Sequence, residues 1–386
     1  MRADARFTTK GFETASGGRE QVISVRVEGG GDFALQQAAV AGAYREAMEA
    51  AGLPPGSAVF RRIFLSDVLN QAAALKGGGL CPGEEEEPVA VSVVEQAPLP
   101  GSKIALLAYH VTDPAGLSKR RVGARHVLVE KSGARHLWST RLCAGAESFP
   151  VSAEAQTRAV FEELIGALGA AGGSLAGNCV RTWMFVKGID VFYPGMVASR
   201  RALFAEQGLT EDTHYIAATG IQGACAHRFD VVAMDAYSQL DLVPGQIAYL
   251  NDFDRLCPTH RYGVTFERGS SVSYADRRQY FISGTASIDG AGQVVHRGDV
   301  LAQLERALGN VEALLGAGSG RLDDLLYLIV YLRDRADAAA IEAAVAERLP
   351  GLPVVFVEGV VCRPEWLVEI EGVGVAALGR AGLAHF

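Results

Sequence analysis

The chain has 386 residues, of which 49% are hydrophobic and 21% charged, so it is long enough for two or three domains with sizeable cores. Its net charge of −8 argues against a nucleic-acid partner, because proteins that bind phosphate backbones present basic surfaces. No apolar run reaches the ~18 residues of a membrane helix, and the first residues lack the apolar core of an export signal, so neither a membrane protein nor a secreted one is expected.

Six cysteines are scattered through the chain without a CxxC motif. They are Cys81, Cys143, Cys179, Cys225, Cys257 and Cys362. Unpaired thiols of this kind indicate a reduced, cytoplasmic protein rather than a disulfide framework or a zinc site. Three histidines, His227, His260 and His296, have no ligand spacing to one another, and a phosphate-binding GxxxxGK[ST] loop is missing. We therefore expect no metal site and no cofactor.

One pattern occurs three times: an amphipathic helix, a Gly-rich turn, an apolar strand and a charged loop. The helices are predicted at residues 35–51, 154–168 and 300–315, and the strands end near Asp67, Gly188 and Asp334. The third helix is the clearest, because its leucines recur at steps of three and four. This repetition predicts three similar units.

Further elements complete each unit. Helices are predicted at 196–207 and 338–348, and closing apolar strands at 103–111, at FDVVAMDAY and at WLVEIEGVGVA. A hairpin is predicted before the third helix, with Gly290-Ala291-Gly292 as its turn. Linkers are expected at 76–88, which contains the acidic run 84–87, and at 238–259.

Units of this size cannot bury both faces of a sheet alone, so they should pack on one another. We expect an α+β fold in which three sheets pack around a pseudo-threefold axis, with a degenerate unit at 1–115, a central unit at 116–250 and a third at 251–386. Because the units cover one another, the protein is expected to be a monomer or a weak homodimer.

The third unit resembles a Rid (YjgF-type) protein over residues 260–376, and the resemblance weakens over 150–237 and 20–115. Rid proteins have a chorismate-mutase-like α+β fold and form homotrimers with ligand sites between subunits. A single chain with three such units resembles the chorismatases, the chorismate-hydrolysing branch of that superfamily. The stretches 180–190, 193–204 and 217–223 are similar to chorismatase motifs in the same order.

The resemblance implies catalytic residues on the last strand. Glu369 and Cys362 match the positions of a catalytic glutamate and cysteine. A carboxyl group on an interior strand has a raised pKa and can deliver a proton near neutral pH. Glu371 lies on the same strand face, so the alternation alone does not separate the two glutamates. Cys362 is either a structural thiol or a site thiol whose pKa the neighbouring Arg363 would lower.

A substrate with two carboxylates calls for arginines and for backbone that a ligand can approach closely. The candidate substrate-binding residues are Arg181, Arg201, Tyr215, Thr219, Gly220, Tyr274, Ala275, Gly284, Thr285 and Arg363. Each has an ordinary alternative as a surface, turn or core residue. The resemblance favours Arg201 and has the adjacent Arg200 face elsewhere, with the reverse assignment of the pair as the alternative.

Two departures from the families are visible. The arginine that holds the substrate carboxylate in deaminating Rid proteins is absent after Leu352-Pro353, which disfavours simple imine hydrolysis. Ala275 resembles chorismatases that give a dihydrodiol, whereas Cys362 resembles those that give 3-hydroxybenzoate.

Three functions are therefore considered. The first is a cofactor-free hydrolase that cleaves the enolpyruvyl ether of chorismate, or of a related cyclic carboxylic acid, to pyruvate and a hydroxybenzoate or dihydrodiol acid. The second is a Rid-like enamine or imine hydrolase in a biosynthetic pathway. The third is a non-catalytic ligand-binding protein of the same fold.

Overall fold

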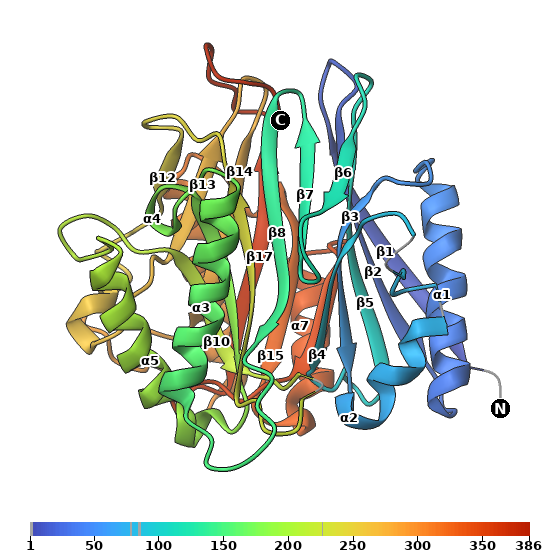
Figure 1. Cartoon of the computed structure of the whole chain (residues 1–386). Coiled ribbons are helices and arrows are strands. Elements are labelled where there is room, and N and C mark those ends of the chain that lie inside the picture. The colour runs from blue at the N-terminus through green and yellow to red at the C-terminus, as the bar shows by residue number, and fades with distance from the viewer. Residues whose placement is uncertain (1–2, 78, 84–85, 226) are drawn as a thin grey trace.

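The computed structural model describes residues 3–77, 79–83, 86–225 and 227–386. They form three sheets that lie side by side, with the long helices on the outside (Figure 1). The strand orders are β1-β2-β5-β3-β4, β10-β9-β11-β8-β7-β6 and β12-β13-β14-β17-β15-β16. The expected α+β architecture of three packed units is confirmed.

The first unit consists of β1 (Asp4–Glu13), β2 (Arg19–Glu28), α1 (Phe33–Ala50), β3 (Ala58–Leu65), α2 (Val68–Gln71), β4 (Ala90–Glu95) and β5 (Ile104–Thr112). The second unit consists of β6 (Ser118–Arg121), β7 (His126–Lys131), β8 (Ala134–Cys143), α3 (Ala153–Ala170), α4 (Leu175–Asn178), β9 (Cys179–Val186), α5 (Ile189–Glu206), β10 (Ala217–Gln222) and β11 (Val232–Gln239). The third unit consists of β12 (Ile247–Tyr249), β13 (Gly269–Ser273), β14 (Arg278–Ala286), α6 (Val300–Ala317), β15 (Leu325–Leu332), α7 (Ala338–Arg348), β16 (Val354–Glu358) and β17 (Val368–Ala376). Short 3₁₀ turns lie at Ala72–Gly77, Thr259–Tyr262, Leu322–Asp324 and Arg335–Asp337.

The three units share one local plan. The first long helix of each unit (α1, α3 or α6) has 18 residues and begins after a capping side chain, Asp32, Ser152 or Asp299. This side chain accepts a hydrogen bond from the backbone N–H of the third residue that follows it. The strand after that helix (β3, β9 or β15) pairs antiparallel with the closing strand (β5, β11 or β17). It also pairs parallel with the short strand β4, β10 or β16.

The sheets meet in one apolar core to which all three contribute. Phe60 of β3 stacks on Trp138 of β8 with ring centroids 4.8 Å apart, and Trp138 contacts Tyr237 of β11 at 4.6 Å. Tyr237 in turn stacks on Phe281 of β14 at 5.2 Å. This aromatic chain crosses the centre of the molecule, where a pseudo-threefold axis requires each sheet to bury its inner face.

Several predicted boundaries were wrong. Helix α5 begins at Ile189, seven residues before the prediction, and Pro194 lies inside it. The segment after β14 forms no second hairpin strand: Ile288 and Val294 make one isolated bridge, and β14 pairs instead with β13 and β17. The short strand β12 occupies part of the expected linker at 238–259.

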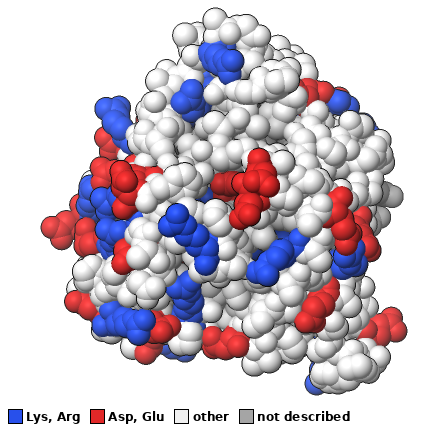
Figure 2. Space-filling model, turned by 90° about the vertical axis from the view of Figure 1, so that its left-hand side faces the viewer, with Lys and Arg blue, Asp and Glu red and all other residues white. Residues whose placement is uncertain are grey.

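The surface agrees with the modest net charge. Of the acidic run at 84–87, Glu86 and Glu87 are exposed, whereas residues 84 and 85 lie outside the described part of the chain. Figure 2 shows the face at the left of Figure 1, where acidic and basic side chains are interspersed without a broad field of either sign. Among the described residues, no helix is long and apolar enough to cross a membrane.

Candidate active site

A cavity of about 220 Å³ lies between the second and third units. The second unit contributes side chains of α5 and β10, and the third contributes the segment before β13, the strands β14 and β17, and the loop that precedes β17. The lining residues are Tyr193, Arg200, Ala218, Gly220, Tyr262, Val264, Phe266, Arg268, Gly284, Ala286, Ile288, Cys362, Arg363, Trp366 and Glu369. The cavity is thus placed as the ligand sites between Rid subunits are expected to be.

Of the residues that the structure describes, Glu369 is the only carboxylic acid that lines this cavity. It stands on β17 opposite Ala286 of β14 and is 5% exposed. Among the described residues it makes neither a hydrogen bond nor an ion pair. Burial raises its pKa to about 8, and the nearby charge of Glu371 contributes further. The side chain is therefore a neutral acid at pH 7, as its interior position led us to expect.

Gly284 makes room for this carboxyl group. A Cβ atom at Gly284 would lie 3.0 Å from the carboxyl carbon of Glu369 and closer still to its Oε1, and 3.1 Å from Cγ2 of Thr219. Distances this short are not tolerated between a side-chain carbon and a packed neighbour, so only glycine allows the carboxyl group to lie against β14 at this point.

Glu371 has a different environment, although it points to the same side of β17. Its carboxylate accepts hydrogen bonds from Arg181 Nη2 at 2.7 Å, from Tyr331 at 3.0 Å, and from Thr219. Arg62 of the first unit approaches it at 3.5 Å and also pairs with Asp235 at 3.0 Å. All of these charged groups are buried, so Glu371 belongs to an ion network that joins the three sheets behind the cavity.

Three arginines line the cavity: Arg200, Arg268 and Arg363. Among the described residues, none of them pairs with a carboxylate. Arg200 and Arg268 are both buried. The Nη2 atom of Arg200 and the Nε atom of Arg268 each lack a hydrogen-bond partner. Arg363 lies over the rings of Tyr262 and Trp366, 4.8 and 4.6 Å from their centroids. Because buried cations are normally paired, guanidinium groups without a carboxylate partner make the cavity electrostatically favourable for an anion.

Cys362 also lines the cavity, next to Tyr193. Burial raises the pKa of its thiol to about 12, and the nearby Glu369 raises it further, whereas Tyr193 and Arg363 oppose the change. Arg363 lowers this pKa, as expected, but desolvation outweighs the guanidinium, so the pKa of the thiol is raised overall. The thiol is neutral at physiological pH.

The structure brings together part of the predicted set. Gly220, Gly284, Cys362, Arg363 and Glu369 line the cavity, while Arg181 and Thr219 lie directly behind it in the network of Glu371. Thr285 is fully buried and donates its hydroxyl to the carbonyl of Ser283, so it does not line the cavity.

Other predicted residues lie elsewhere. Arg201 is exposed and donates to the carbonyl of Gly263, so the choice of Arg201 over Arg200 was wrong. Tyr215 packs on Phe204 behind α5. Tyr274 donates to Gln239 at 2.6 Å and the N–H of Ala275 donates to Ala384 at 2.8 Å, near the opposite end of β14 from Gly284. Tyr274 and Ala275 are therefore not part of this cavity.

Sequence reasoning missed several residues of the site, namely Tyr262, Phe266, Arg268 and Trp366. The first three lie between the expected linker at 238–259 and β13, in a segment for which no element was predicted. For Arg200 a signal was available: it falls four residues after Met196 and three before Leu203, on the buried stripe of α5. That periodicity distinguishes Arg200 from Arg201.

Comparisons with known proteins agree with this geometry. The family model described as endoribonuclease L-PSP matches residues 269–376. A chorismatase of Streptomyces rapamycinicus is 33% identical over 248 residues, which cover 57% of this chain and 70% of that protein. A 3-hydroxybenzoate synthase of Streptomyces hygroscopicus is 33% identical over 130 residues, or 29% of this chain and 38% of the synthase.

The fold comparison extends over most of the chain. A chorismatase crystal structure superimposes with a TM-score of 0.63 at 21% identity, covering 84% of this chain and 96% of the other. Taken with the identity to the Streptomyces rapamycinicus protein, this similarity shows that the chain belongs to the chorismatase family.

Proposed function

We propose that this protein is a hydrolase of chorismatase type that cleaves the enolpyruvyl ether of chorismate, or of a closely related cyclic acid, to release pyruvate. The observation that carries the proposal is the neutral carboxyl group of Glu369, with a pKa of about 8, in a cavity with three unpaired arginines. A proton donor and an anion site are thus present in one place, which is what the hydrolysis of an enol ether that carries carboxylates requires.

The first step is proton transfer. Glu369 would deliver its proton to the methylene carbon of the enolpyruvyl group, and the ether oxygen would stabilise the cation that forms at the neighbouring carbon. General acid catalysis of this kind contributes about 10² to 10⁴-fold to the rate when the pKa of the donor lies near the working pH. The pKa of Glu369 meets that condition, whereas Glu371 is engaged in ion pairs with Arg62 and Arg181.

Water then completes the reaction. It adds to the cationic carbon and returns a proton to the Glu369 carboxylate, which restores the acid. The resulting hemiketal breaks its bond to the ring oxygen and leaves pyruvate and a ring alcohol. No redox change occurs, so the residues of the cavity suffice for every proton that moves.

The arginines would bind the two carboxylates of the substrate. Arg200 and Arg268 each have a buried N–H without a partner, and Arg363 extends from the loop before β17. Guanidinium groups bind carboxylates in two-point fashion, which fixes orientation as well as charge. Binding of the anions would also satisfy the orphaned N–H groups, which cost free energy while they remain buried and unpaired.

For the ring product we propose 3-hydroxybenzoate, which forms when the dihydrodiol loses its C4 hydroxyl group and C3 hydrogen as one water, in preference to the dihydrodiol itself. Support comes from Cys362, which lies in the cavity beside Glu369, while Ala275, the residue that resembles dihydrodiol-forming relatives, lies outside it. We further propose that the protein acts in the cytoplasm, where six free cysteines stay reduced, and that it is a monomer or weak homodimer.

Chromatography of the purified protein incubated with chorismate tests the function. Release of pyruvate together with one equivalent of a hydroxybenzoate or dihydrodiol acid is expected. Absence of turnover, with 2-aminoacrylate hydrolysed instead, would establish the imine hydrolase in its place. Light scattering should give the 40.8 kDa mass of one chain or twice that value, and an obligate trimer would contradict the internal pseudo-trimer.

A further inference from the structure

A second groove corresponds in position to the active-site cavity. It lies between the first and second units, and its lining includes Val93, Cys143, Cys225 and His227. Across β8 and β11, Cys143 lies opposite Ala233, just as Ala286 lies opposite Glu369 across β14 and β17. The second groove therefore has alanine where the active site has its acid, and the Cys143 thiol where the active site has Ala286.

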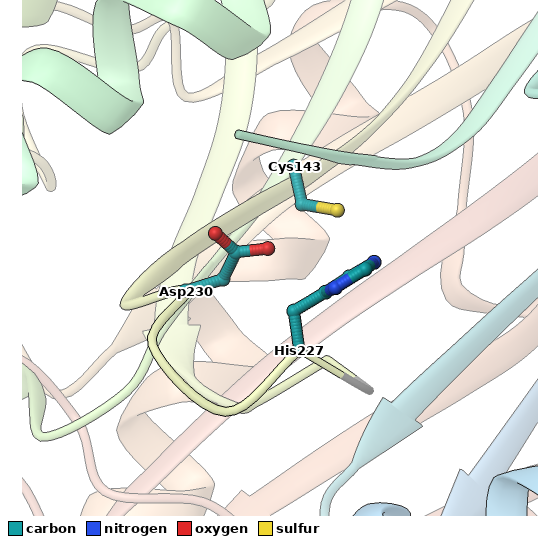
Figure 3. Close-up of side chains that lie close together, drawn as sticks. All are labelled: Cys143, His227 and Asp230. Atoms are coloured by element: carbon teal, nitrogen blue, oxygen red, sulfur yellow. The ribbon is translucent and has the colours of Figure 1, made fainter. Parts of the chain in front are cut away.

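A compact group of metal-binding side chains occupies this groove (Figure 3). Cys143 is the last residue of β8, and His227 and Asp230 lie in the loop between β10 and β11. One ligand atom from each of the three lies within 4.8 Å of the others. Cys143 and Asp230 are buried, whereas His227 is exposed. The close-up shows the three side chains pointing toward one another.

Cys225 brings a second sulfur to the same place. Its thiol lies 3.7 Å from Oδ2 of Asp230. Cys225 thus lies beside the group, whose three close ligand atoms are the thiol of Cys143, the imidazole of His227 and the carboxylate of Asp230. They are contributed by the end of β8 and a single loop.

Neighbouring groups hold these side chains in place. Asp230 accepts hydrogen bonds from the backbone N–H groups of Gly145 at 3.1 Å and Ala146 at 2.8 Å. Arg125 donates to the sulfur of Cys143 at 3.4 Å and is itself paired with Glu163 at 2.7 Å. Supporting hydrogen bonds of this kind orient the ligands of known metal sites.

We propose that Cys143, His227 and Asp230 form a binding site for a zinc ion, separate from the active site. Sulfur, imidazole and carboxylate ligands suit Zn²⁺ better than Mg²⁺ or Ca²⁺, which prefer oxygen alone, and three protein ligands leave the fourth position for water. The Cys143 thiol releases its proton to solvent when it binds the metal. Exposed His227 provides the route of entry.

The charges in the groove are compatible with a cation. Arg121, Arg125 and Arg141 also line the groove, but Arg125 is paired with Glu163 and Arg141 is exposed. In the bound state one thiolate and one carboxylate would carry two negative charges, which match the two positive charges of the ion. The ion would join the loop between β10 and β11 to the end of β8 and so stabilise this end of the second unit.

The test uses the full chain, stripped with a chelator, kept under a reductant that does not bind metals, and titrated with Co²⁺ as a spectroscopic probe of the zinc site. We expect one equivalent to bind with a sulfur-to-cobalt charge-transfer band and tetrahedral ligand-field bands, and Zn²⁺ to displace it. Zn²⁺ should also raise the Tm of the stripped protein.

His227→Ala should fold normally, because His227 is exposed, and should weaken Co²⁺ binding by about tenfold or more. Cys143→Ser should remove intensity from the charge-transfer band. The matched controls are His260→Ala, which alters a histidine outside the group, and Cys81→Ser, which alters a half-buried thiol of the same groove. Both should bind like the parent protein. Absence of the sulfur-to-cobalt band in the reduced protein, or an unchanged affinity in His227→Ala, would overturn the proposal.

Discussion

Glu369 and Glu371 lie two positions apart on the same face of β17, and only Glu371 is neutralised by arginines. Arg181 lies 2.7 Å from the carboxylate of Glu371, and Arg62 lies 3.5 Å away. Glu369 faces the cavity instead, where burial raises its pKa to about 8. One strand thus carries a structural anion and a neutral acid, and the difference comes from what each side chain contacts rather than from its place in the alternation.

The first prediction concerns pH and turnover. If protonated Glu369 is the general acid, turnover should be constant below pH 8 and fall above it, by about tenfold per pH unit. Turnover measured from pH 5 to 10 at saturating substrate checks this. A rate that rises through pH 8 would show that Glu369 acts as a base instead.

The second prediction concerns pH and stability. The pKa of Glu369 is raised from 4.5 to about 8 in the folded protein, so between these values only the folded state holds the proton. The stabilising contribution is complete below pH 4.5 and is lost as pH rises through 8, at about 1.4 kcal/mol per unit and on the order of a few kcal/mol in total. Compared with the parent, Glu369→Gln should gain Tm at pH 9 and differ little at pH 4.5; an equal difference at both values would contradict the raised pKa.

The third prediction concerns Gly284. Gly284→Ala should push the carboxyl group of Glu369 away from β14 and lower turnover by about 10²-fold, since a displacement of ~1 Å at a reacting group has that effect. Gly166→Ala in α3 is the control, because a Cβ there meets no atom within 4 Å. It should leave turnover unchanged and stabilise the helix by about 0.5–1 kcal/mol. Normal turnover in Gly284→Ala would mean that the position of the carboxyl group is unimportant.

The fourth prediction distinguishes the two adjacent arginines. Arg200→Lys keeps the charge but loses the planar fork, so KM should rise by about tenfold or more while the protein stays folded. Arg201→Lys should leave KM unchanged, because Arg201 is exposed and contacts only the Gly263 carbonyl. Similar KM values for both variants would remove Arg200 from the substrate site.

The fifth prediction concerns the product. Cys362→Ala should shift the product from hydroxybenzoate towards the non-aromatic dihydroxy acid while consumption of chorismate continues, and Cys362→Ser provides a variant of similar size. The thiol, with a pKa of about 12, is neutral, so any influence comes from its shape and hydrogen bonding. An unchanged product ratio in both variants would assign Cys362 a structural role only.

The repeat pattern predicted three packed units because each helix and strand carries its own local signal: a capping side chain, an apolar stripe, and a Gly-rich turn. Glu369 could be predicted because its position matches a family motif. Arg268, Tyr262 and Trp366 could not, because they come from irregular segments whose placement depends on how the units dock. The prediction of Arg201 instead of Arg200 as a site residue was avoidable, because helical periodicity places Arg200 with Met196 on the buried face of α5.

Tyr274 and Ala275 show the limit of motif similarity. They precede the strand that carries Gly284, and the resemblance to the chorismatases suggested that they share its site. The extended strand β14, nine residues long, instead keeps its two ends apart. Ala275, just before the strand, contacts Ala384, whereas Gly284, near its other end, lies against Glu369. The ion network of Arg62, Asp235 and Glu371 was equally inaccessible, because its members come from three different units.

A comparison of Glu369→Gln with Glu371→Gln tests the central claim most directly, with turnover of chorismate and Tm measured for both. The account predicts that Glu369→Gln loses about 10²-fold or more in turnover and keeps its fold, because the amide has the same shape but no acidic proton. Glu371→Gln should do far less to turnover in the protein that remains folded, and instead lower the free energy of unfolding by about 3–5 kcal/mol, because Arg62 and Arg181 lose their buried counter-charge. Equal losses of turnover in the two variants, or none in either, would contradict the assignment of Glu369 as the proton donor.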